Sequence, residues 1–228
     1  MADLRTIVAN YEPSPEIIEA IKTITLVAVI GPACVGKTTL IKLAVEHDPS
    51  IHLVLSYTSR LARPGEVNGV EYNFQTKLQM IEQLKKQEFV QVAPLVSDDL
   101  YASRLSSFGQ PGGTAILAVW ATALEQFRQL PFRTLRTIFI TPPDFSEWQR
   151  RLSQRTFSAE LLQKRMIEAK NSFSLALKDK NLQFIINDEL NLAEANFLQL
   201  IRGEMNPELL SDQSKARQII ASILSQIK

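Results

Sequence analysis

Residues 24–38 read ITLVAVIGPACVGKT, a continuous apolar run followed by a loop that holds two glycines and a lysine. The run Ile24–Ile30 is rich in β-branched residues, which is typical of a strand buried on both faces of a parallel sheet. Residues 31–38 fit the pattern G-x-x-x-x-G-K-[ST], in which backbone N–H groups surround phosphate oxygens. Because a helical pattern follows from about Lys37 to Glu46, this stretch predicts a strand, a phosphate-binding loop and a helix.

Two side chains of the loop carry specific chemistry. Lys37 can reach the β- and γ-phosphates of a nucleotide, and the Thr38 hydroxyl can contact Mg²⁺. Cys34 lies inside the loop. It is either a small filler side chain or a redox-sensitive thiol that blocks the nucleotide.

Strand-like and helix-like patterns alternate along the rest of the chain, which predicts an α/β fold with a parallel sheet covered by helices. Strands are expected at 51–56, 89–95, 114–120, 135–141 and 183–186. A short helix is expected to open at Ser14-Pro15, with Ile17, Ile18 and Ile21 on one side, and further helices at 77–87, 121–129, 144–154, 158–178 and 191–202. Residues 1–13 are expected to be a loose lead-in. The apolar spacing of residues 214–228 predicts a helix that docks on its own domain or contacts a partner.

Composition excludes several function classes. The 228 residues carry 25 Lys and Arg against 24 Asp and Glu, and a net charge of +1 argues against general nucleic-acid or membrane-surface binding. One cysteine excludes an internal disulfide, and two histidines argue against a histidine-based zinc site. No apolar run approaches the ~18 residues of a membrane span, and the N-terminus does not resemble a secretory signal, so a cytoplasmic location is expected.

A second polar segment, SYTSRLARPGEVNGVEYNFQ at residues 56–75, follows the second predicted strand. The guanidinium groups of Arg60 and Arg63 and the hydroxyl of Tyr72 can together hold a second dianion. A solvated basic turn is the alternative interpretation.

The same segment resembles the monophosphate-binding region of guanylate kinases, whose pattern is roughly S-x-[TS]-T-R-x-x-R-x-G-E-x-x-G-x-[DE]-Y-x-F. The matching positions are Ser56, Thr58, Arg60, Arg63, Gly65, Glu66, Gly69, Glu71, Tyr72 and Phe74. The loop GPACVGKTTL is similar to the family's GPSGVGKGTL. Further likeness lies in Tyr101-Ala102-Ser103, in the arginine-bearing lid (Arg151 to Arg155 and Lys164-Arg165-Met166) and in Ile186-Asn187-Asp188, and the resemblance covers about residues 26–203.

The resemblance implies a three-layer α/β P-loop NTPase fold with a parallel core sheet. The expected organisation is an N-terminal extension (1–23), a guanylate kinase-like domain (24–203) and a C-terminal helical extension (204–228). Within the domain, residues 57–104 would form a small monophosphate-binding subdomain and residues 150–165 a mobile lid. The implied activity transfers the γ-phosphoryl group of ATP, with Mg²⁺, to GMP or a related monophosphate; a homodimer is left open.

The resemblance also assigns roles to individual residues. Lys37, Arg60, Arg155 and Arg165 would be catalytic. The ATP contacts would be Gly31, Ala33, Cys34, Val35, Gly36, Lys37, Thr38, Thr39, Arg151 and Asn187, with Thr38 also contacting the metal. The acceptor contacts would be Ser56, Arg60, Arg63, Glu66, Tyr72, Gln91, Tyr101 and Ser103.

The sequence departs from the family pattern at three places. Gln91 stands where the family carries a glutamate that binds guanine, Ala118 and Trp120 replace two carboxylates, and Ser153-Gln154-Arg155-Thr156 replaces R-G-R-G. Trp120 could stack on a base or fill the core, and Asp98 and Asp99 could supply replacement acceptors or be exposed turn acids. Three functions therefore stay open: a nucleoside monophosphate kinase, a kinase with a changed acceptor, and an inactive nucleotide- or protein-binding module.

Overall fold

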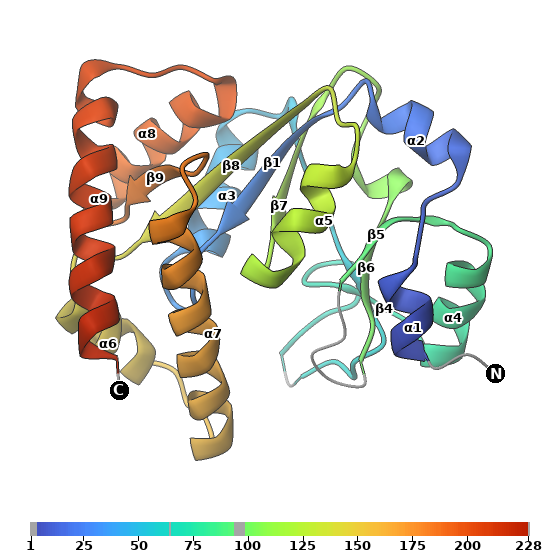
Figure 1. Cartoon of the computed structure of the whole chain (residues 1–228), viewed down its shortest axis with the longest axis horizontal. Coiled ribbons are helices and arrows are strands. Elements are labelled where there is room, and N and C mark those ends of the chain that lie inside the picture. Colours follow the sequence, from blue (N-terminus) through green and yellow to red (C-terminus); the bar gives the residue numbers. More distant parts are fainter. Residues whose placement is uncertain (1–3, 64, 94–98, 228) are drawn as a thin grey trace. The chain divides into compact units, whose positions relative to one another are not determined.

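The computed structural model describes residues 4–63, 65–93 and 99–227 (Figure 1). The chain forms two compact units. The first comprises Met1–Leu26, Ser50–Leu117 and Thr122–Leu135, and the second comprises Val27–Pro49, Ala118–Ala121 and Arg136–Lys228.

The larger sheet has five strands in the order β2 (Ile51–Leu53), β7 (Thr114–Ala118), β1 (Thr25–Ile30), β8 (Thr134–Thr141) and β9 (Gln183–Ile186). Every residue of β1 is buried, as its unbroken apolar pattern predicts. Ile51 lies opposite Thr114 in the parallel pair β2–β7, and Phe139 lies opposite Phe184 in the parallel pair β8–β9. The predicted α/β fold with a parallel core sheet is confirmed.

Seven predicted helices are confirmed, with ends within a few residues of those expected. They are α2 (Pro15–Ile21), α3 (Lys37–His47), α4 (Lys77–Lys85), α5 (Leu124–Gln129), α6 (Phe145–Ser153), α7 (Ala159–Lys178) and α8 (Leu190–Arg202). Local capping explains several starts, because the side chains of Ser14, Asp144 and Ser158 each accept a backbone N–H of the helix that follows. Across the described ranges, no helix combines the length and the apolar character needed to cross a membrane.

The first unit also contains a small mixed sheet in the order β4 (Asn73–Phe74), β3 (Tyr57–Thr58), β6 (Tyr101–Arg104) and β5 (Phe89–Val92). Strands β3 and β4 pair in parallel, whereas β6 is antiparallel to both β3 and β5. The strand expected over 89–95 ends at Val92, and residues 94–98 lie outside the described part of the chain. The two-residue strands β3 and β4 are too short to show a period of two, so the sequence did not predict them.

The prediction of a loose lead-in over residues 1–13 is wrong for the part of it that the structure describes as helical. Residues Leu4–Ala9 form the helix α1, and its Val8 packs in an apolar cluster with Met80, Leu84 and Phe89. Figure 1 shows α1 beside α4 in the first unit. A six-residue helix has little stability of its own, so it forms here because this long-range packing stabilises it.

The C-terminal helix begins earlier than expected. Helix α9 runs over Pro207–Gln226 rather than from residue 214, because Asn206 caps it and Pro207 occupies its first turn. It packs against α7 and β9, as Figure 1 shows for the second unit. The prediction that this helix docks on its own domain is therefore confirmed.

Candidate functional site

The phosphate-type loop lies between β1 and α3 in the second unit. A side chain at Gly31 would place its Cβ 2.6 Å from the carbonyl oxygen of Ile140, so only glycine is accommodated there. Gly36 precedes α3 with a φ of 99°, a left-handed conformation that favours glycine. Cys34 also has a positive φ, of 64°. The loop therefore has the tight, glycine-dependent backbone that its sequence pattern predicts.

Lys37 folds back over this loop. Its Nζ donates to the carbonyl oxygens of Gly31 and Pro32, each at 2.7 Å. Burial has the largest effect on Lys37 and, together with the positive charges of Arg165 and Arg155, lowers its pKa to about 8. Arg165 and Arg155 are therefore close enough to Lys37 for their charges to act on it, and an anion bound beside Lys37 would be stabilised by this positive charge.

Thr38 and Thr39 lie exposed in the first turn of α3. The Thr38 hydroxyl is thus available to a metal ion or to solvent. Magnesium takes oxygen ligands and retains several waters beside substrate phosphates, and the Thr38 hydroxyl could supply one of these oxygens.

Asn187 and Arg151 are both predicted to contact the nucleotide. In the structure Asn187 binds the loop, and Arg151 binds Asn187. The buried Asn187 Nδ2 donates to the Val35 carbonyl at 2.8 Å. Arg151 donates to the Asn187 carbonyl at 2.9 Å and to Glu147 Oε1 at 2.7 Å. These contacts hold the loop from the carboxyl end of β9, so in this structure both residues position the loop.

Two further supports were missed by sequence reasoning. The buried Trp148 donates its indole N–H to the Ala33 carbonyl at 2.9 Å. Glu147 accepts from both Arg150 and Arg151, which lower the pKa of its carboxyl to about 2, Arg150 having the larger effect. Trp148 lies within a predicted helix, but nothing in its spacing indicates contact with Ala33, more than a hundred positions earlier. Glu147 lies on the same helix and binds Arg150 and Arg151 at the spacing of ion pairs within a helix.

The two predicted lid arginines lie in different surroundings. Arg155 is exposed just after α6, where its backbone N–H bonds the Leu152 carbonyl. Arg165 lies on α7 and donates to Glu168 Oε2 at 2.6 Å. Its Nε is buried and has no hydrogen-bond partner among the residues that the structure describes.

The predicted acceptor site lies in the first unit, and Arg60 is its most constrained cation. Its guanidinium group binds Glu66 through both carboxylate oxygens, at 2.8 and 3.0 Å, and lies 5.4 Å from the ring centroid of Tyr72. Glu66 also accepts the backbone N–H of Arg63 at 2.8 Å. The ion pair raises the pKa of Arg60 and lowers that of Glu66, so both groups stay charged.

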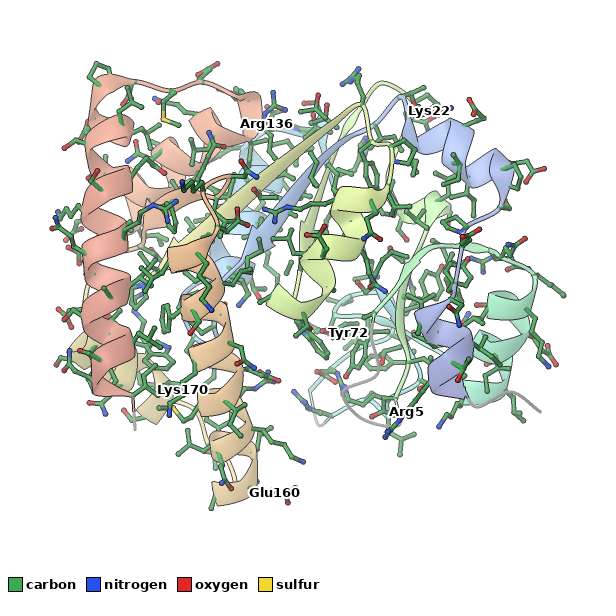
Figure 2. All side chains as sticks on the ribbon, viewed as in Figure 1. Arg5, Lys22, Tyr72, Arg136, Glu160 and Lys170 are labelled. Carbon is green, nitrogen blue, oxygen red and sulfur yellow. The ribbon has the colours of Figure 1, made fainter. Side chains whose placement is uncertain are left out.

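Aromatic residues surround this pair. The rings of Tyr72 and Tyr101 meet edge to face with centroids 6.0 Å apart, and the Phe74 ring lies beside Tyr72, with its centroid 5.5 Å from the Arg60 guanidinium carbon. Burial raises the pKa of Tyr72, so its hydroxyl remains a hydrogen-bond donor. Figure 2 labels Tyr72 among the side chains of the first unit. Arg63, by contrast, is exposed. These groups resemble a preformed anion site, with Glu66 holding Arg60 in place.

Gln91 and Ser103 face each other across strands β5 and β6. Gln91 is 7% exposed and Ser103 only 1% exposed. The Nε2 of Gln91 donates to Oε1 of Gln126 on α5 at 2.6 Å, and the Ser103 hydroxyl is buried without a partner in the described chain. Sequence reasoning missed Gln126, because no motif or spacing connects it with Gln91.

The remaining predicted positions are placed as follows. Ser56 is half-buried, and its carbonyl accepts the Asn73 backbone N–H at 2.9 Å. Ala118 lies exposed at the end of β7. Trp120 is 38% exposed, so the interpretation that it fills the core is wrong. Asp99 is half-buried rather than an exposed turn acid, and Asp98 lies outside the described residues.

Comparison with known proteins identifies relatives of the chain. A family profile described as guanylate kinase matches residues 23–203. The chain is 33% identical over 186 residues to the guanylate kinase of Aliivibrio fischeri, covering 79% of this chain and 88% of that protein. It is 32% identical over 181 residues to the guanylate kinase of Prochlorococcus marinus, covering 78% of this chain and 97% of that protein.

A solved structure shares the fold. The crystal structure of guanylate kinase from Anaplasma phagocytophilum matches with a TM-score of 0.58 and 19% identity. The match covers 82% of this chain and 89% of that chain. Residues 1–22 and 204–228, with α1, α2 and α9, lie outside the family profile.

Proposed function

The chain belongs to the guanylate kinase family, and on this premise we propose that it transfers the γ-phosphoryl group of ATP to GMP or a related nucleoside monophosphate. The proposal rests on where Lys37 lies and on which charges act on it. It lies on a complete phosphate-type loop and interacts electrostatically with Arg155 and Arg165. A loop that only connected the strand to the helix would not require a lysine near two arginines.

In this proposal the ATP phosphates bind the backbone N–H groups of residues 31–39 and the ammonium of Lys37. Thr38 would hold Mg²⁺, which neutralises charge on the phosphates when bound. Asn187, Arg151 and Trp148 keep the loop in its binding conformation through the hydrogen bonds described above.

The acceptor's phosphate would bind Arg60 and Arg63 together with the hydroxyls of Tyr72 and Tyr101. Glu66 holds the guanidinium group of Arg60, and the adjacent Tyr72 and Phe74 rings lie against it, so little side-chain entropy is lost when the anion binds. Ser56, Gln91 and Ser103 would approach the base.

Phosphoryl transfer of this type needs no covalent nucleophile from the protein. Positioning of the two substrates and positive charge around the transferred group supply the rate enhancement. Lys37, Arg155 and Arg165 would provide that charge in the second unit, and Arg60 would hold the acceptor phosphate.

One observation favours a second candidate, a kinase whose acceptor carries another base. Gln91 is a neutral amide where the family pattern carries a glutamate. A neutral group binds guanine less strongly than a carboxylate does, since hydrogen bonds to charged groups are worth roughly 1.5–3 kcal/mol and neutral ones about 1 kcal/mol.

The test is ADP formation from MgATP with GMP, dGMP, IMP, AMP, CMP, UMP or no acceptor. Robust turnover with GMP that Lys37→Ala abolishes, while that variant keeps its melting temperature, would support the proposal. Turnover with a different monophosphate would favour the second candidate. No turnover with any acceptor, despite ATP binding measured by calorimetry, would refute both and indicate a binding module.

A further inference from the structure

A polar cluster of three side chains lies in the first unit: Gln91 on β5, Ser103 on β6 and Gln126 on α5. Gln91 and Ser103 are cross-strand neighbours, and both are more than nine-tenths buried. Buried polar groups are nearly always hydrogen-bonded, because leaving one unpaired costs free energy. The buried Ser103 hydroxyl has no partner within the described residues, so this cluster is incomplete without a ligand.

Gln126 determines how the carboxamide of Gln91 is used. A carboxamide has a donor end and an acceptor end that are nearly equal in shape, so its orientation depends on its partners. Here the 2.6 Å bond joins Nε2 of Gln91 to Oε1 of Gln126. With the donor end engaged in this way, Oε1 of Gln91 is the end that remains for a ligand.

Gln126 lies on helix α5, which is packed against the rest of the first unit. Its neighbours Leu124 and Phe127 are buried in the core of the first unit. The side chain of Gln126 therefore projects from a packed helix, and its Oε1 accepts a hydrogen bond from Nε2 of Gln91.

We propose that Gln126 is a specificity-determining positioning residue, which binds Nε2 of Gln91 so that Oε1 of Gln91 faces an N–H donor on the acceptor base. The inference rests on the proposed function, because it assumes that a nucleoside monophosphate binds the first unit. The chemical class it selects is the 6-oxopurine, whose N1–H is a donor. Adenine has an unprotonated N1 at the same place. This nitrogen is an acceptor, so it cannot form a hydrogen bond with Oε1 of Gln91, which is also an acceptor.

Loss of the Gln126 acceptor frees the Gln91 carboxamide to turn. Both orientations then become available, one that suits a donor at N1 and one that suits an acceptor there. The proposal therefore predicts weaker binding of GMP and smaller discrimination against AMP, whereas the binding of ATP in the second unit is unaffected.

The decisive experiment compares Gln126→Met, which keeps the length of the side chain without an acceptor, with Gln126→Glu, which restores an acceptor for Nε2. The control is Gln129→Met, an exposed residue at the end of the same helix. Calorimetry of GMP, IMP and AMP without ATP gives the affinities, and steady-state rates give KM for each substrate.

We expect Gln126→Met to weaken GMP binding by about five- to tenfold, the usual effect of one lost hydrogen bond. The GMP-to-AMP preference should fall with it, at an unchanged melting temperature and an unchanged KM for ATP. Gln126→Glu should restore most of the preference, and Gln129→Met should behave as the parent protein. A merely structural role would instead lower the melting temperature and affect both substrates.

Two results would overturn the inference. One is an unchanged GMP-to-AMP preference in Gln126→Met, and the other is a parent protein that binds GMP and AMP equally well or binds neither. Failure of the proposed function is a separate result, since a protein that binds GMP selectively but forms no ADP would refute the kinase and leave the role of Gln126 supported.

Discussion

The side-chain carboxamide of Gln213 hydrogen-bonds both backbone groups of Phe184. The Phe184 N–H donates to Oε1 of Gln213 at 2.7 Å, and Nε2 of Gln213 donates to the Phe184 carbonyl at 3.2 Å. Phe184 lies on β9, the last strand in the order of the five-stranded sheet, where one side of the strand has no neighbouring strand. Helix α9, which lies outside the family profile, thus supplies the partner that a sixth strand would supply.

Replacing Gln213 with leucine should destabilise the second unit. The change leaves the N–H and C=O of Phe184 unpaired beneath α9, at a cost of about 1–3 kcal/mol. The midpoint of urea unfolding should fall accordingly, and Gln218→Leu, at an exposed position on the same helix, serves as the control. Equal midpoints for the two variants would show that Gln213 contributes nothing to the edge of the sheet.

Tyr11 binds the edge of the small sheet in the first unit, as Gln213 binds the edge of the larger sheet. Its hydroxyl donates to the Phe89 carbonyl at 2.7 Å and accepts the Phe89 N–H at 2.8 Å, on the edge strand β5. Tyr11→Phe should therefore lower the free energy of unfolding by about 1–2 kcal/mol. A stability unchanged within the error of urea titrations would contradict this.

The same tyrosine predicts a dependence on alkaline pH. Burial raises the pKa of Tyr11 to about 12, from 10.0 in the unfolded chain. Between these values the unfolded state loses the proton first, so the folded state holds more protons and stability falls as the pH rises. Unfolding titrations from pH 9 to 12 should show a steeper decline for the parent protein than for Tyr11→Phe.

Lys37 should make ATP binding depend on pH. Its pKa is lowered to about 8, and a bound polyphosphate would favour the charged form and raise that pKa. ATP binding should then take up a proton near pH 8, and the affinity should fall by up to about tenfold per pH unit above it. Calorimetry in buffers of different ionisation enthalpy measures the uptake. Lys37→Arg, which does not titrate in this range, should show none.

Asn187 should control ATP affinity without touching the acceptor site. Removal of its amide in Asn187→Ala breaks the buried bond to the Val35 carbonyl and loosens the loop. ATP affinity should fall about five- to tenfold, the effect of one lost hydrogen bond, while GMP affinity stays constant. Asn191→Ala, at an exposed position of α8, is the matched control. A parallel loss of GMP binding would indicate global damage instead.

Restoring carboxylates should shift base preference. Gln91→Glu together with Ala118→Asp would place negative charge where guanine presents N–H donors, and charged hydrogen bonds are stronger than neutral ones. The ratio of GMP to AMP turnover should rise by about tenfold or more. An unchanged ratio would show that the base is recognised by other residues.

Local patterns predicted much of the fold. The apolar run of β1, the glycine pattern of the loop and the Ser14, Asp144 and Ser158 caps involve residues only a few positions apart, so they can be read directly from the chain. The helix α1 could not be predicted in this way, because it depends on packing against Met80, Leu84 and Phe89, far along the chain.

The sequence by itself determined the α/β fold, the phosphate-type loop and the family, because each depends on short patterns or on aligned residues. Only the tertiary structure decided which side chains support the candidate site. The bonds Asn187–Val35, Trp148–Ala33 and Gln91–Gln126 span 152, 115 and 35 positions. The orientation of Gln91 likewise depends on contacts between residues distant in sequence. So do the hydrogen bonds between Tyr11 and Phe89 and between Gln213 and Phe184. A hydrogen bond needs two groups within about 3 Å at a suitable angle, and only the folded chain brings residues so far apart in sequence to that distance.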